Sequence, residues 1–105
     1  MSLILTDENF EKEITDAKLP VVVDFFATWC HPCSALAPVL EKVAEEMKDK
    51  IILAKVNVDS AQMASQKHGV ERIPTVILFK DGQPKGGFVG LAEEADIKKW
   101  ISENI

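Results

Sequence analysis

Two cysteines, the only ones in the chain, lie in the stretch Ala27-Thr28-Trp29-Cys30-His31-Pro32-Cys33. The two residues between them allow the thiols to close a small disulfide ring. A ring of this size restricts the unfolded chain less than a larger loop does, so stabilisation is a poor reason for the pair. The spacing favours redox chemistry, in which Cys30 and Cys33 alternate between dithiol and disulfide.

Other interpretations of the pair remain open from the residues alone. The cysteines could be ordinary small buried hydrophobic residues. A structural zinc site needs four ligands, and beyond Cys30, Cys33 and the adjacent His31 only His68 remains, far along the chain. An iron–sulfur cluster would need two copies of the chain to supply enough thiolates. We favour the redox pair, which requires neither a metal nor a tightly bound cofactor.

The cysteines lie where an apolar β-type run gives way to a helical pattern. A helix that begins at Cys33 would place its free N–H groups and positive dipole end beside the Cys30 sulfur, where a thiolate is favoured. Pro32 suits the first turn of such a helix, because its missing N–H is not needed there. A CxxC motif at a strand-to-helix junction therefore indicates a dithiol redox site.

The 105 residues predict one domain that spans 1–105. A net charge of −5 without a run of lysine or arginine argues against a nucleic-acid or anionic-membrane partner. The first residues carry no basic region, and no apolar run approaches the ~20 residues of a membrane span. We expect a cytoplasmic protein, and nothing in the sequence requires an oligomer, so we expect a monomer.

Hydrophobic periodicity predicts the order βαβαβαββα and an α/β fold, a mixed sheet between helix layers. Thr6 and Ser60 are the predicted N-caps of the first and third helices, the second helix is predicted to begin at Cys33, and Pro38 is expected to kink it. Asp81-Gly82 is a strong hairpin signal, and His68 is expected at a helix end on the surface. The predicted strands cover 3–5, 21–27, 51–59, 76–79 and about 85–89.

Asp24 and Lys55 interrupt the two most apolar strands. A carboxylate in a strand buried on both faces is costly, so its pKa is expected to rise. We favour a proton-transfer role for Asp24, six residues before Cys30, over an exposed structural position at a strand edge. Lys55 could extend to solvent or reach Asp24 in the interior, and the sequence leaves both open.

Over nearly its whole length the chain resembles the thioredoxin family. The resemblance implies the thioredoxin fold, a five-stranded mixed β-sheet flanked by four α-helices. It rests on residues at about the family's separations: Asp24, Ala27, Trp29, Cys30, Pro32, Cys33, Pro38, Lys55, Asp59, Ile73, Pro74, Thr75, Gly82 and Gly90.

The resemblance also assigns roles to the candidate catalytic residues. It makes Cys30 the exposed nucleophile and Cys33 the buried resolving thiol. Asp24 and Lys55 are similar to the buried pair that handles the proton of Cys33.

The family's substrate-binding surface corresponds to Trp29, Ile73, Pro74 and Gly90. By this resemblance Pro74 follows a cis peptide bond and faces the disulfide. Such a bond presents Ile73 in an extended form that can pair with a substrate strand. Trp29, Ile73 and Gly90 would form the apolar contact surface around the sulfurs.

Three residues depart from the family pattern. His31 stands where thioredoxins usually carry glycine, and the pair His31-Pro32 between the cysteines tunes the reduction potential. An imidazole beside Cys30 would stabilise its thiolate, so we expect a somewhat more oxidising protein than an ordinary thioredoxin. Ser34 replaces the usual lysine or arginine, and Phe26 replaces the usual tryptophan.

We therefore expect a thiol-disulfide oxidoreductase that reduces protein disulfides and is recycled by a thioredoxin reductase, flavin- or ferredoxin-dependent. Two alternatives stay open. His31 could make the protein an oxidase or disulfide isomerase, or the reduced chain could act as a binding subunit of a larger enzyme.

Overall fold

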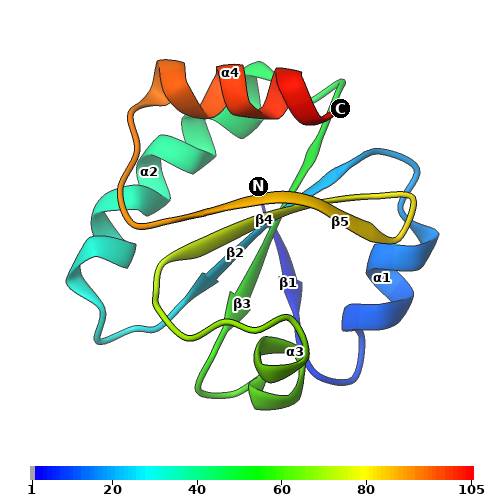
Figure 1. Ribbon diagram of the computed structural model, residues 1–105, viewed down its shortest axis with the longest axis vertical. Helices are drawn as coiled ribbons and strands as arrows, with labels where there is room; N and C mark the ends of the chain where they lie inside the picture. Colours follow the sequence, from blue (N-terminus) through cyan, green and yellow to red (C-terminus); the bar gives the residue numbers. More distant parts are fainter. Residues whose placement is uncertain (1) are drawn as a thin grey trace.

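The computed structural model describes residues 2–105 and has the predicted element order (Figure 1). Its elements are β1 (Leu3–Leu5), α1 (Phe10–Asp16), β2 (Val21–Phe26), α2 (His31–Glu46), β3 (Ile52–Asn57), α3 (Gln62–Lys67), β4 (Thr75–Lys80), β5 (Gln83–Val89) and α4 (Glu94–Asn104). The strands form one sheet in the order β1-β3-β2-β4-β5. β3 pairs in parallel with β1 and β2, whereas β4 pairs antiparallel with β2 and β5. The predicted mixed sheet of five strands with four helices is confirmed.

Helices cover both faces of the sheet, with α2 and α4 on one side and α1 and α3 on the other (Figure 1). The two-residue period of β2 explains why both faces are apolar. Val22 packs with Leu36 and Leu40 of α2, whereas Val23 and Phe25 pack in the cluster on the opposite face. A strand buried on both faces is central, as its apolar pattern without polar alternation predicted.

The predicted N-caps of α1 and α3 and the predicted start of α2 are wrong by three, one and two residues. α1 begins at Phe10, because Thr6 and Asn9 exchange side-chain and backbone hydrogen bonds in a turn before it. α2 begins at His31 with Cys30 as its N-cap, and Pro38 lies inside this one helix. α3 begins at Gln62, and the carboxylate of Asp7 accepts hydrogen bonds from the backbone N–H groups of Met63 and Ala64 in its first turn. Capping from a distant element leaves no local sequence signal.

His68 is the C-cap residue of α3, so the predicted helix end is confirmed, but its predicted surface position is wrong because the residue is half-buried. Its ring lies 5.1 Å from the ring of Phe10 and 5.1 Å from that of Phe79. Burial, together with the neighbouring charge of Lys67, lowers the pKa of His68. The imidazole thus fills an apolar position between α1 and β4 in its neutral form.

The β4–β5 hairpin turns at Asp81 and Gly82, which both have positive φ, at 54° and 79°. This conformation matches the Asp-Gly hairpin signal in the sequence. Gly86 is needed for a close approach, because a Cβ there would lie 3.0 Å from the side chain of Asn104 in α4. The hairpin therefore packs directly against the last helix.

Asp24 lies fully buried on the face of β2 that α2 covers. It pairs in register with Lys55 of β3, whose Nζ lies 3.6 Å from Asp24 Oδ2. The two alternatives for Lys55 are thereby resolved in favour of Asp24, although 3.6 Å is too long for a hydrogen bond. Burial raises the pKa of Asp24 to about 6, Lys55 opposes the rise, and Glu41 adds to it. The predicted rise is confirmed.

The raised pKa makes a testable link between Asp24 and stability. In the folded state Asp24 keeps its proton up to a pH of about 6, whereas an unfolded aspartate has a pKa of 3.8. The free energy of unfolding therefore falls as the pH rises through about 6. A rise from 3.8 to about 6 is worth roughly 3 kcal/mol. Asp24→Asn should therefore raise the free energy of unfolding by up to about that amount at pH 8, and much less at pH 4.

Denaturant unfolding of the oxidised protein at both pH values measures this effect. Asp49→Asn, at an exposed position, is the matched control and should change stability little at either pH. An Asp24→Asn variant that is no more stable than the parent at pH 8 would contradict the account.

Candidate active site

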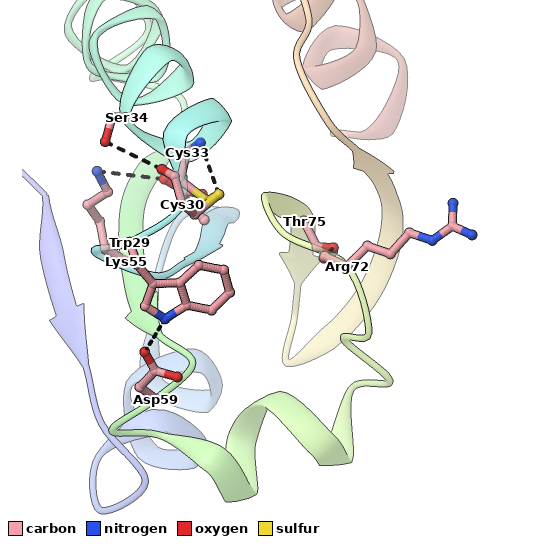
Figure 2. Close-up of a disulfide and its surroundings, with 9 residues drawn as sticks. Trp29, Cys30, Cys33, Ser34, Lys55, Asp59, Arg72 and Thr75 are labelled. Carbon is pink, nitrogen blue, oxygen red and sulfur yellow. Dashed lines mark hydrogen bonds and ion pairs between the residues drawn. A yellow bond between two sulfur atoms is a disulfide. The ribbon is translucent and has the colours of Figure 1, made fainter.

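Cys30 and Cys33 form a disulfide at the start of α2, with their Cα atoms 5.3 Å apart (Figure 2). Cys30 is the N-cap residue, and its sulfur accepts a hydrogen bond of 3.2 Å from the backbone N–H of Cys33. A free helical N–H aimed at a sulfur stabilises negative charge there. The sequence correctly predicted that the start of a helix lies beside the Cys30 sulfur, although the predicted start at Cys33 is two residues late.

Both cysteines are shielded from solvent. Cys30 is 5% exposed and Cys33 is 3% exposed, and with Ala27 they form a small cluster against which Phe26, Val58 and Ile73 pack. The prediction of an exposed Cys30 is therefore wrong for the disulfide form. The exposed residues at the tip are His31 and Pro32, which lie between the two sulfurs in sequence.

Trp29 forms one side of the site. Its side chain is 70% exposed, yet the indole Nε1 donates a hydrogen bond of 2.8 Å to Asp59 (Figure 2). Asp59 follows β3, so the bond ties the loop before α2 to the end of a neighbouring strand. The ring is thereby held in place while its apolar surface stays accessible.

The loop before β4 forms the opposite side of the site. The Ile73–Pro74 peptide bond is cis, as the resemblance implied. Thr75 Oγ1 donates to the backbone carbonyl of Arg72, and the N–H of Gly90 donates to the carbonyl of Pro74 at 2.9 Å. Gly90 has a φ of 89°, which favours glycine. These bonds bring Ile73, Pro74 and Gly90 together beside the cysteine cluster.

A hollow of about 290 Å³ lies on the Cys33 side of the disulfide. Lys55 lines it together with Cys33 and Ser34, and the ammonium of Lys55 also lies 5.3 Å from the ring centre of Phe26. Neither oxygen of Asp24 has a hydrogen-bond partner among the described residues. The hollow is large enough to admit water, so it can connect Cys33 with Lys55 and the buried carboxylate behind it.

Some functional groups were not predicted from the sequence. Glu41, on α2, raises the pKa of Asp24, and only the packing of α2 on the sheet reveals this. The bond between Trp29 and Asp59 joins residues thirty positions apart, and no local pattern signals it. Ser34 departs from the family pattern, and its hydroxyl donates a long hydrogen bond of 3.5 Å to the Cys30 carbonyl.

Within residues 2–105, no three or more histidine, cysteine, aspartate and glutamate side chains are grouped so that they could hold a metal ion. None of the helices in this part of the chain combines the length and apolar character needed to cross a bilayer.

Comparison with known proteins agrees with this geometry. The profile of the family described as Thioredoxin matches residues 1–103. A thioredoxin of Rickettsia bellii is 40% identical over 105 residues, which is 100% of each chain. Thioredoxin C-2 of Corynebacterium nephridii is 42% identical over 95% of this chain and 93% of its own.

A thioredoxin of Pseudomonas aeruginosa is 40% identical over 96% of this chain and 94% of its own. These full-length similarities extend the match well beyond the cysteine motif, across the sheet and the helices that hold it. With its sulfur pair at the start of α2, this thiol-disulfide oxidoreductase belongs to the thioredoxin family.

Proposed function

We propose that the protein reduces disulfide bonds of other proteins, with Cys30 as the nucleophile and Cys33 as the resolving thiol. The observation that carries this assignment is the hydrogen bond from the Cys33 N–H to the Cys30 sulfur at the start of α2. It favours a thiolate at Cys30, whereas Cys33 lies one turn inside the helix and is the less exposed of the two.

The reaction takes two exchange steps. The Cys30 thiolate attacks one sulfur of the substrate disulfide, a mixed disulfide forms, and the other substrate sulfur leaves as a thiolate that takes up a proton. The Cys33 thiolate then attacks the Cys30 sulfur, and the second substrate sulfur leaves. Two electrons pass to the substrate, and the Cys30–Cys33 disulfide remains.

Asp24 and Lys55 serve the second step by accepting the Cys33 proton. A carboxyl group with a pKa of about 6 is suited to take a proton from a thiol near neutral pH. The hollow that Cys33 shares with Lys55 supports transfer through water, with Asp24 beyond Lys55. Asp24 thus accepts the proton of the Cys33 thiol indirectly, through Lys55 and water in the hollow.

The substrate lies over Trp29, Ile73, Pro74 and Gly90. Ile73 packs against the cysteine cluster, and the exposed face of Trp29 offers apolar contact on the other side. An extended substrate segment pairs with the backbone of Ile73 beside the cis peptide bond. This surface contacts the backbone and the apolar side chains of a substrate, so it can bind substrate segments of many different sequences.

The oxidised pair is returned to the dithiol by a thioredoxin reductase, either flavin- or ferredoxin-dependent. A cytoplasmic location suits this cycle, because cytosolic thiol systems keep such pairs mainly reduced. The single chain acts as a monomer that carries electrons between the two partners.

Trapping the mixed disulfide tests the assignment of the two cysteines. With Cys33→Ser, reaction with a protein disulfide should stop after the first step and leave the substrate joined to Cys30. Mass spectrometry of the non-reduced adduct identifies the linked residue. Cys30→Ser is the matched control and should form no adduct. A main adduct through Cys33, or a parent protein that does not accelerate disulfide reduction, would refute the proposal.

A second candidate function, oxidation or isomerisation of disulfides, rests on His31 at the first position of α2. A cationic or dipolar ring beside the Cys30 sulfur stabilises the reduced form and raises the reduction potential. We expect the parent potential to lie above that of His31→Gly, and nearer the ~−270 mV reference of thioredoxin itself than the ~−180 mV of protein disulfide isomerase.

Equilibration with glutathione, followed by Trp29 fluorescence, measures both potentials. A parent potential equal to or below that of His31→Gly would overturn the tuning role of His31. A value near that of protein disulfide isomerase would favour the oxidase or isomerase over the reductase.

A further inference from the structure

Arg72 is the only arginine among the twelve lysine and arginine residues of the chain. It directly precedes Ile73 and the cis bond to Pro74, and it is exposed. Every side-chain ion pair within residues 2–105 uses a lysine, and Arg72 takes part in none of them. The one guanidinium of the protein therefore stands free at the edge of the active site.

The main chain of Arg72 accepts a hydrogen bond, whereas its side chain makes no ion pair within residues 2–105. Thr75 Oγ1 donates to the Arg72 carbonyl, and the next residues are held by the bond between Gly90 and Pro74. Figure 2 shows Arg72 and Thr75 on one side of the disulfide and Trp29 with Asp59 on the other, and the Arg72 side chain extends away from the sulfurs. A segment bound over Ile73 would pass next to this guanidinium.

The neighbouring surface is apolar. Val89 is 56% exposed and Leu91 is 62% exposed, on either side of Gly90. Val89 pairs in register with Thr75, so this apolar segment lies against the same loop that carries Arg72. The rim of the site on this side thus combines exposed apolar side chains with the cation of Arg72 and the exposed carboxylate of Glu71.

Charge on the two sides of the disulfide is opposite. Asp59 lies on the Trp29 side, where Lys55 is paired with Asp24, and Arg72 lies on the other side with the exposed Glu71 directly before it, in a protein whose net charge is −5. The overall charge repels acidic partners, so a local cation at the substrate path matters most for them. Arginine also differs from lysine, because its planar fork binds a carboxylate through two parallel hydrogen bonds and is more weakly hydrated.

We infer that Arg72 is a specificity-determining residue that selects protein disulfides with an aspartate or glutamate within a few residues of the attacked cysteine. The inference rests on the proposed function and deepens it. The carboxylate pairs with the guanidinium, while apolar neighbours of the substrate cysteine contact Val89 and Leu91. Arg72 takes no part in the exchange steps, so it alters the choice of substrate and leaves the chemistry of the sulfurs unchanged.

The experiment compares three short peptides, each closed by one disulfide, whose cysteines are flanked by glutamate, lysine or glutamine. The second-order rate constant for their reduction by the dithiol protein is followed by fluorescence at low salt. Arg72→Gln is the test variant. Lys85→Gln is the matched control, because it removes the same charge from an exposed position in β5 near the hairpin turn.

The quantity of interest is the rate with the glutamate peptide divided by the rate with the lysine peptide. Arg72→Gln should lower this ratio about threefold or more, because the variant loses one exposed charge contact with the glutamate peptide and one repulsion of the lysine peptide. Lys85→Gln should change it less than about 1.5-fold, and 0.5 M salt should remove the difference between the variants. The glutamine peptide should be reduced equally fast by all three proteins.

Equal changes of the ratio in the two variants would overturn the role of Arg72, because the effect would then be one of net charge. If the parent protein failed to reduce even the glutamine peptide, the proposed function itself would fall, and this inference with it. The neutral peptide therefore distinguishes the two failures.

Discussion

The active site depends on the hydrogen bond from the Cys33 N–H to the Cys30 sulfur. The bond exists only because α2 begins at the cysteine pair, so the free N–H groups of its first turn point at the sulfur. Leu36 and Leu40 hold the helix against β2, and β2 in turn delivers the chain to Cys30. The packing of the core thereby fixes the electrostatics of one sulfur atom.

The buried carboxylate of Asp24 is the second constraint on the design. An apolar residue on this face of β2 would pack without the penalty of desolvation, so the charge reduces stability near neutral pH. Lys55, whose Nζ lies 3.6 Å from Asp24 Oδ2, only partly offsets the effect of burial on the Asp24 pKa. A buried carboxylate without full compensation inside a well-packed core is typical of a functional group. The proton transfer that we propose for Asp24 would therefore come at a cost in stability at this position.

Much of the fold follows from local patterns in the sequence. The apolar run at 21–26, interrupted only by Asp24, marks the central strand, and Asp81-Gly82 marks the hairpin, because each depends on the residues themselves. Helix starts were less predictable. The cap of α3 comes from Asp7, which lies fifty-six residues before Met63, and a local reading chose Ser60 instead.

The active site was predictable to the extent that its chemistry is local. The spacing of Cys30 and Cys33 and the burial of Asp24 could be inferred from neighbouring residues. Which way Lys55 pointed depended on the register between β2 and β3, and the low exposure of Cys30 depends on Ile73 from a distant loop. Contacts between distant segments are set by tertiary packing, which periodicity does not encode.

The most direct test of the account is the pKa of the Cys30 thiol in the reduced protein. The rate of alkylation by iodoacetamide, measured against pH and assigned to each cysteine by mass spectrometry, reports this value. The helix N-terminus predicts that Cys30 reacts first, with a pKa at least about one unit below the ordinary value of ~8.5. A Cys30 pKa at or above ~8.5, or faster alkylation of Cys33, would contradict the central role assigned to the start of α2.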